Sequence, residues 1–158
     1  MNSRIPGSAS SQRTEAFAKR MHNCNPSFEP EAFRRLTGSN LVASKVGYGS
    51  YRVDQRSDEH ARTLRAAIQG GCNLIDTSSN YTDGGSEILI GNVLKELISA
   101  KQLERAEMIV VSKVGYIQGQ NLDEAVRRES SGQPWEDVIK YMDGCWHCIH
   151  PDFLVDQW

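Results

Sequence analysis

The fold of this chain is decided by residues 71–113, which begin GCNLIDTSSNY (residues 71–81) and end MIVVSK (residues 108–113). Each quoted run passes from apolar residues to a charged one, Asp76 in the first and Lys113 in the second. The segment between the two runs repeats its apolar residues at the spacing of one helix face. A strand, a helix and a strand in this order predict a βαβ unit with parallel strands.

The alternation of strands and helices continues on both sides of this unit. Ser57 is a typical helix-capping residue, and Gly70 and Gly71 are typical helix-ending residues. Ser86 is the expected N-cap of the next helix, within which Gly91 indicates close packing against the sheet. We expect strands over residues 41–51, 72–76 and 108–111, helices over residues 57–70, 86–98, 121–128, 135–142 and 151–158, and irregular structure over residues 145–150.

The chain divides into a polar arm and a folded domain. Residues 1–33 are rich in serine and proline, which predicts a flexible arm with one short helix over residues 14–21. Residues 34–158 carry the alternating pattern and are expected to form one α/β domain with a parallel sheet.

Composition narrows the function classes. A net charge of −2 indicates neither a nucleic acid nor a membrane as partner. No apolar run approaches the roughly 18 to 20 residues that span a bilayer, and the polar arm lacks the apolar core of a secretory signal. We therefore expect a cytoplasmic protein whose four cysteines are reduced.

Two charged residues end neighbouring strands of the expected sheet. Ligands of α/β folds bind at the carboxyl ends of parallel strands, where Asp76 and Lys113 stand. These two residues alone are equally consistent with a structural ion pair. Tyr81 lies five residues beyond Asp76, in a loop at the same edge.

A tyrosine beside a lysine has a specific chemical use. The ammonium favours a deprotonated phenol, so a phenol in that place gives up its proton more readily. Such a group protonates a carbonyl oxygen as negative charge develops on it. On this hypothesis Asp76 holds Lys113 in place and Lys113 tunes Tyr81. The alternative is that Tyr81 is an ordinary loop tyrosine.

The run CWHCIH (residues 145–150) offers four candidate metal ligands. A Cys-x-x-Cys pair binds zinc or cycles as a dithiol in other proteins. Haem attachment would need a histidine where Ile149 stands. Because four ligands this close in sequence seldom surround one ion tetrahedrally, we expect no metal and a loop with incidental cysteines.

Three parts of the sequence resemble a known family. They are residues 71–81 with Ser86, Glu87 and Gly91, then residues 110–113, then residues 46–51. The first is similar to the leading signature of the aldo-keto reductases, the second to their lysine-bearing third strand, and the third to their first-strand turn. The resemblance covers residues 34–130.

The resemblance implies a (β/α)₈ TIM barrel that binds a nicotinamide cofactor, NADP(H), and reduces carbonyls reversibly. By the family's pattern Tyr81 is the proton donor, and Lys113 and Asp76 tune it. The residues that match the turn beside the nicotinamide are Gly49, Ser50, Tyr51 and Asp76.

The chain also departs from the family. A barrel of this kind takes about 250 residues, and about three βα units are expected here. The family's catalytic histidine follows the fourth strand, a pattern that Ile149-His150-Pro151 matches only superficially. We therefore expect a partial barrel, the N-terminal portion of a truncated aldo-keto reductase that lacks this histidine and most of the NADP(H) site.

Two functions stay open at this point. One is an NADP(H)-dependent oxidoreductase that acts on a small-molecule carbonyl, incomplete or inactive as this chain. The other is a non-catalytic remnant that associates with itself or with a complementing chain through exposed sheet edges.

Overall fold

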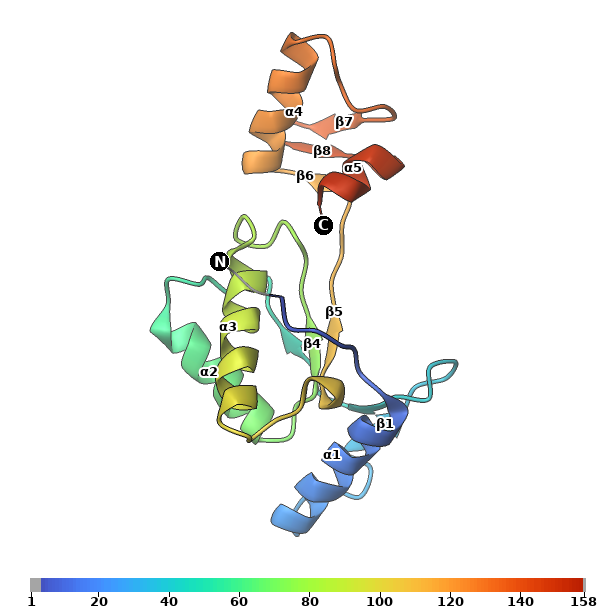
Figure 1. Ribbon diagram of the computed structural model, residues 1–158, viewed down its shortest axis with the longest axis vertical. Helices are drawn as coiled ribbons and strands as arrows, with labels where there is room; N and C mark the ends of the chain where they lie inside the picture. Colours follow the sequence, from blue (N-terminus) through green and yellow to red (C-terminus); the bar gives the residue numbers. More distant parts are fainter. Residues whose placement is uncertain (1–3, 158) are drawn as a thin grey trace.

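A three-stranded parallel sheet forms the centre of the computed structural model, which describes residues 4–157 (Figure 1). Its strands are β3 (Tyr48–Gly49), β4 (Leu74–Asp76) and β5 (Ile109–Val111), in the order β3-β4-β5. The apolar runs of β4 and β5 pair in parallel, with Ile75 opposite Val110. Asp76 therefore ends the middle strand, between the ends of both neighbours.

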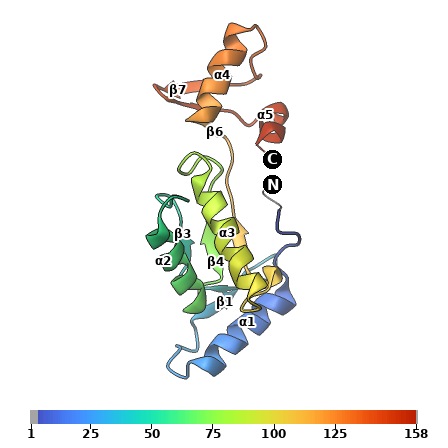
Figure 2. The ribbon, with the colours of Figure 1, turned by 60° about the vertical axis from the view of Figure 1, so that its left-hand side comes forward.

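Two helices lie side by side on one face of this sheet (Figures 1 and 2). Helix α2 (Asp58–Gln69) begins after Ser57, whose hydroxyl accepts from the His60 amide, and ends at Gly70, as the sequence predicts. Helix α3 (Gly85–Ser99) begins one residue earlier than expected. Its N-cap is Gly84 in a left-handed conformation, so the prediction that Ser86 caps the helix is wrong.

The apolar faces of these elements share one core. Its buried residues are Phe17, Val53, Leu64, Ile68, Ile75, Leu89, Ile90, Val93, Leu94, Leu97, Leu103 and Met108. Gly91 is not part of the close packing that the sequence predicts. A Cβ at Gly91 would meet no atom within 4 Å, so this glycine faces open space instead of the sheet.

Residues 4–33 are more ordered than the flexible arm expected over residues 1–33, of which residues 1–3 lie outside the described part of the chain. Helix α1 (Ser11–Cys24) contains the expected short helix and extends it at both ends. Phe17, only 1 % exposed, packs into the core, because the helix carries an apolar stripe on one face. Arg20 of α1 makes a bidentate ion pair with buried Glu107 of η1 (Arg105–Glu107).

The single strand expected over residues 41–51 is two strands. β2 (Val42–Ser44) pairs antiparallel with β1 (Phe33–Arg35), whereas β3 pairs parallel with β4. The buried Asn73 side chain explains the split, because it accepts from the Ser44 amide and donates to Val42 O. This amide holds β2 beside the start of β4 without extending the parallel sheet.

A second, smaller unit follows the parallel sheet. It contains β6 (Tyr116–Ile117), α4 (Gln120–Ser130), β7 (Ile139–Met142), β8 (Cys145–His147) and α5 (Pro151–Asp156). The strands form an antiparallel sheet in the order β6-β8-β7, over a core of Ile117, Ala125, Trp135, Cys148 and Phe153. Figures 1 and 2 show this unit standing beyond the end of β5, joined to it by an extended segment. We call residues 114–157 the small unit and residues 4–113 the βα body.

The small unit corrects two sequence predictions. Residues 139–142 form β7 instead of a helix, and residues 145–147 form β8 instead of irregular structure. The two strands are joined by Asp143-Gly144, and Asp-Gly between two strands is a strong hairpin signal. Gly144 takes the positive φ (74°) that this turn requires. The helix expected over residues 151–158 is present as α5 but ends at Asp156, and residue 158 lies outside the described residues.

Two side chains of the loop that carries Tyr81 tie the body to the small unit. Asp83 accepts from the backbone and side-chain nitrogens of Gln120, at 3.1 and 3.0 Å, at the start of α4. Asn80 donates to Gln118 Oε1 at 2.6 Å. Gly119, with a positive φ, allows this approach, because a Cβ there would collide with the Asp83 carboxylate.

Candidate active site

The charged ends of β4 and β5 meet as an ion pair. Lys113 Nζ donates to Asp76 Oδ1 at 2.7 Å, and both side chains are about half exposed. Burial tends to lower the pKa of Lys113, but its hydrogen bonds with Asp76 and Tyr81 outweigh this and raise the pKa. Lys113 is therefore a firmly held cation at neutral pH.

The Tyr81 ring lies against this cation. Lys113 Nζ is 5.0 Å from the centroid of the Tyr81 ring, within the range of a cation–π contact. The Tyr51 ring packs edge-on against Tyr81, with 5.2 Å between ring centroids. The structure thus brings together Asp76, Tyr81 and Lys113, the three residues predicted to be catalytic.

The loop after Tyr81 has an unusual backbone. Thr82, Asp83 and Gly84 all have positive φ, at 50°, 54° and 85°. Such conformations are costly for residues with a side chain and need surrounding contacts to hold them. The Thr82 hydroxyl donates to Val53 O at 2.6 Å, which ties this loop to the segment after β3. These contacts fix the place of Tyr81.

A buried network of hydroxyl groups, which the sequence does not predict, supports the backbone at Asp76. Ser86 Oγ lies 3.0 Å from Thr77 Oγ1 and donates to Ser50 Oγ at 2.8 Å. Ser50 in turn donates to Asp76 O from its hydroxyl and its amide. All three hydroxyl residues are buried. Small hydroxyl residues beside Asp76 and near a helix start are equally typical of loops and caps, so the local pattern alone does not predict this network.

The residues predicted to bind the cofactor have different surroundings. Gly49 lies opposite Asp76, and a Cβ there would meet nothing within 4 Å. The Tyr51 side chain is 68 % exposed beside Tyr81. Ser50 is fully buried, and its hydroxyl serves the network just described. Exposed Tyr51, open space at Gly49 and the Asp76 carboxylate fit a flat ring with polar substituents.

A cavity of about 540 Å³ lies between the loop after β3 and the loop that carries Tyr81. Its lining residues are Tyr51, Arg52, Asp54, His60, Asn80, Tyr81, Thr82 and Gln118. The cavity is thus walled by polar and aromatic side chains next to the proposed proton donor.

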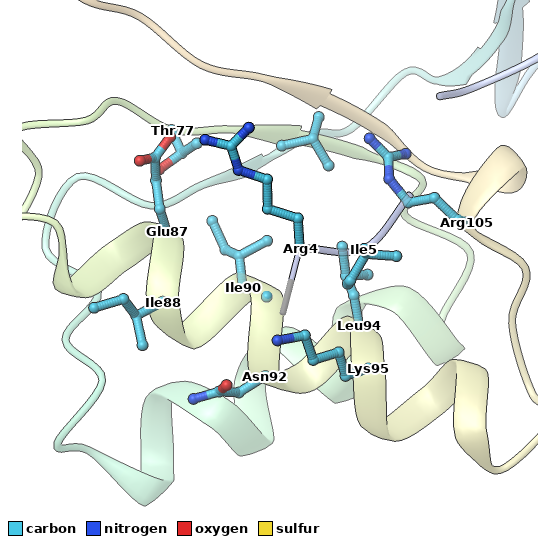
Figure 3. Close-up of a pocket in the computed structure, with 12 residues that line it drawn as sticks. Arg4, Ile5, Thr77, Glu87, Ile88, Ile90, Asn92, Leu94, Lys95 and Arg105 are labelled. Atoms are coloured by element: carbon cyan, nitrogen blue, oxygen red, sulfur yellow. The ribbon is translucent and has the colours of Figure 1, made fainter. Parts of the chain in front are cut away.

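A separate cavity of about 410 Å³ runs along α3, as Figure 3 shows. Its apolar wall comes from α3 and β5, and Arg4 and Ile5 lie across it. Gly91 opens onto this cavity. The residues that line it include neither Tyr81 nor Lys113, so it is not the candidate active site.

The histidines near the C-terminus have structural contacts. His147 in β8 packs edge-on against Tyr116 at 5.3 Å between ring centroids. His150 caps α5, where its Nδ1 accepts from the Asp152 amide. Cys148 is buried and donates to Glu136 O. Within residues 4–157 no group of three or more metal-ligating side chains is placed to hold an ion.

None of the helices described between residues 4 and 157 is long and apolar enough to cross a membrane. The cytoplasmic location expected from the sequence stays a prediction.

The chain thus has a parallel βα sheet with Asp76, Tyr81 and Lys113 gathered at its carboxyl edge. The family model named Aldo/keto reductase family matches residues 45–143, which is more than half of the chain. The chain therefore belongs to the aldo/keto reductase family.

Two curated relatives are 31 % identical to this chain. One is a 6-dehydroglucose reductase of Novosphingobium aromaticivorans, matched over 97 residues, or 56 % of this chain and 31 % of the relative. The other is an L-galactose dehydrogenase of Arabidopsis thaliana, matched over 132 residues, or 78 % of this chain and 40 % of the relative. The matches thus span well under half of each relative.

A solved structure confirms the fold. The holo form of an aldo-keto reductase from Bacillus halodurans superposes with a TM-score of 0.55 at 21 % identity. The match covers 78 % of this chain and 33 % of that one. The expected α/β fold, a partial (β/α)₈ barrel, is therefore present.

Proposed function

We propose that this protein is an NADP(H)-dependent oxidoreductase that reduces a carbonyl to an alcohol, with Tyr81 as the proton donor. One observation carries the proposal: the Lys113 ammonium, held by Asp76 at 2.7 Å, faces the Tyr81 ring at 5.0 Å. Membership of the family and relatives whose names include reductase and dehydrogenase support an oxidoreductase.

The chemistry assigns each residue one task. A bound NADPH would supply the hydride for the carbonyl carbon, and negative charge would then develop on the carbonyl oxygen. The Tyr81 hydroxyl gives its proton to that oxygen, so that an alcohol forms. Lys113 stabilises the phenolate left on Tyr81, and Asp76 keeps Lys113 charged and in place.

The exposed residues beside Tyr81 would hold the nicotinamide end of the cofactor. Tyr51 would pack on the nicotinamide ring, the open space at Gly49 would admit the ring, and the Asp76 carboxylate would be an acceptor for its polar groups. Ser50 acts indirectly, since its buried hydroxyl positions Asp76 through Asp76 O.

A cofactor titration tests this proposal. We expect NADPH fluorescence to change as the chain binds it, and Tyr51→Ala to weaken binding by about tenfold because ring packing is lost. Tyr141→Ala is the matched control, since that exposed tyrosine lies in the small unit. Absence of NADPH binding at millimolar concentration would contradict an oxidoreductase role for this chain.

A second candidate function is assembly with another chain, and the sheet edges favour it. In residues 4–157 neither β3 nor β5 pairs on its outer side. Val46, two residues before β3, and Val111 of β5 are 76 % and 44 % exposed. Unpaired edges with exposed apolar residues favour pairing with a further strand. Size-exclusion chromatography with light scattering tests this function, and a stable monomer at high concentration would contradict it.

A further inference from the structure

In the cavity beside Tyr81, hydrogen-bond donors and hydrogen-bond acceptors differ in how far they are already paired within the protein. Its volume of about 540 Å³ is in the range that holds a small molecule. It is lined by six polar side chains and two tyrosines, with no aliphatic residue. What the cavity can bind is therefore set by which of its polar atoms still lack a partner.

Within residues 4–157, the only carboxylate that lines the cavity is already engaged. The Asp54 carboxylate receives the Arg56 guanidinium and the Arg56 amide. Hydrogen bonds from Arg56 lower the pKa of Asp54 to about 2, so this pair is ionised and mutually neutralised at neutral pH.

The amide oxygens and the imidazole in the wall are engaged in the same way. Asn80 Oδ1 accepts from the Ser78 hydroxyl, and Gln118 Oε1 accepts from Asn80. His60 Nδ1 accepts from the Asp54 amide at 3.0 Å. A neutral His60 must therefore carry its proton on Nε2, as a donor.

The remaining nitrogen donors include the Arg52 guanidinium, His60 Nε2 and the side-chain nitrogen of Gln118. The hydroxyls of Tyr51 and Tyr81 also line the cavity. Across residues 4–157 the structure gives Arg52 neither a hydrogen bond nor an ion pair. Because Asp54 and Arg56 neutralise each other, Arg52 leaves the cavity with a net positive charge.

We propose that this cavity is a subsite for an anionic group, a carboxylate or a phosphate, carried by the carbonyl substrate. Arg52 binds the anion through its fork of N–H donors, and His60 Nε2 donates to the same group. Tyr51 and Tyr81 lie edge to face along the cavity, so an anion at Arg52 places the rest of the ligand against Tyr81. The inference names the substrate class of the proposed reductase site and rests on that function.

Ligand binding without cofactor tests the subsite. The probes are D-glucuronate, its neutral methyl ester, D-glucose 6-phosphate and D-glucose, titrated into the full chain while backbone amide NMR shifts are followed. We expect the two anions to bind at least about tenfold more tightly than their neutral counterparts, because hydrogen bonds to a charged group are worth more than neutral ones. The tighter of the two anions shows whether the group is a carboxylate or a phosphate.

Matched variants assign the preference to one side chain. Arg52→Gln should reduce the discrimination between acid and ester to less than about twofold. Arg62→Gln removes the same charge from an exposed position on α2 outside the cavity and should leave the discrimination intact. Equal binding of acid and ester by the wild type, or retained discrimination in Arg52→Gln, would overturn the subsite.

The experiments can contradict the anion subsite and the reductase function separately. Discrimination between anion and ester without any NADPH-dependent reduction would support the subsite and contradict the function. Reduction of carbonyl compounds without any preference for anionic ones would support the function and contradict the subsite.

Discussion

The βα body and the small unit differ in the size of their cores. The core cluster of the body has twelve buried residues, whereas that of the small unit has five. Buried apolar area is the main stabilising contribution to folding, so the body should be the more stable region. The body also carries Asp76, Tyr81 and Lys113, whereas the small unit adds only Gln118 to the cavity wall.

The difference in core size indicates that the two regions have different roles. The larger core holds the reacting groups in fixed positions, which proton transfer requires. The smaller region is attached through the Tyr81 loop, where Asp83 and Asn80 bind the start of α4. The small unit should therefore depend on the body for its structure, and the body should not depend on the small unit.

Removing the aromatic centre of the small core should have the largest effect. Phe153 is fully buried against Trp135, and Phe153→Ala should cost about 4 kcal/mol of unfolding free energy. Because the core of the small unit has only five buried residues, we expect this loss of stability to unfold the small unit alone. All three tryptophans lie beyond residue 130, so their fluorescence reports this event. Cooperative loss of β3, β4 and β5 in the same variant, seen by hydrogen exchange, would refute the asymmetry.

Ile75→Ala should destabilise the body by about 3 kcal/mol, because it leaves a cavity in the central strand. Both regions should then lose structure together in urea, monitored by far-ultraviolet circular dichroism and tryptophan fluorescence. Val46→Ala, at a site 76 % exposed, is the control and should change stability by less than about 0.5 kcal/mol. Tryptophan fluorescence that stays native after the body has unfolded would count against the dependence.

Arg20→Ala should cost about 2 kcal/mol, because it leaves the Glu107 carboxylate buried without its charged partner. Arg13→Ala is a matched control, since Arg13 pairs with Glu104 where both side chains are half exposed. That substitution should cost less than about 1 kcal/mol. Equal losses in the two variants, measured by urea denaturation, would mean that α1 is not anchored by the buried pair.

Asp83→Ala should weaken the attachment between the regions by about 1 kcal/mol, the usual value of a helix cap. Amide exchange in α4 should rise while exchange in α3 stays unchanged. Asp123→Ala, a loss of the same charge further along α4, is the control. Exchange in α4 that does not respond to Asp83→Ala would mean that the loop does not hold the small unit.

The smallest effect concerns pH. Hydrogen bonds from Lys19 and Arg35 lower the pKa of Glu15 to about 2, from an ordinary value of 4.5. A carboxyl whose folded pKa is depressed contributes stability that is complete above the unfolded pKa and is lost as pH falls through the folded one. The melting temperature should fall between pH 4.5 and about 2, and Arg35→Gln should flatten this slope. An unchanged slope would show that this pair does not contribute.

The same comparison explains what the sequence could predict. Local signals predicted β4, β5 and α2 correctly, because apolar runs and a capped apolar stripe act within a few residues. They failed where distant contacts decide. Trp135, Ile139 and Met142 have helical spacing, yet pairing with β8 across Asp143-Gly144 makes residues 139–142 a strand.

The candidate site was predictable in part for a related reason. Asp76 and Lys113 follow from their position at strand ends, and Tyr81 from its loop and the family signature. The buried network of Ser50, Thr77 and Ser86 was not predictable. Whether a serine caps a helix or bonds across the core depends on tertiary packing, which the local pattern does not encode.

The rate of NADPH-dependent carbonyl reduction in Tyr81→Phe tests the central claim most directly. If Tyr81 donates the proton, this variant should bind NADPH as the wild type does but reduce carbonyls about 10² to 10⁴ times more slowly. Tyr116→Phe, in the small unit, should keep the wild-type rate. Equal rates in wild type and Tyr81→Phe would contradict the assignment of Tyr81 as the proton donor.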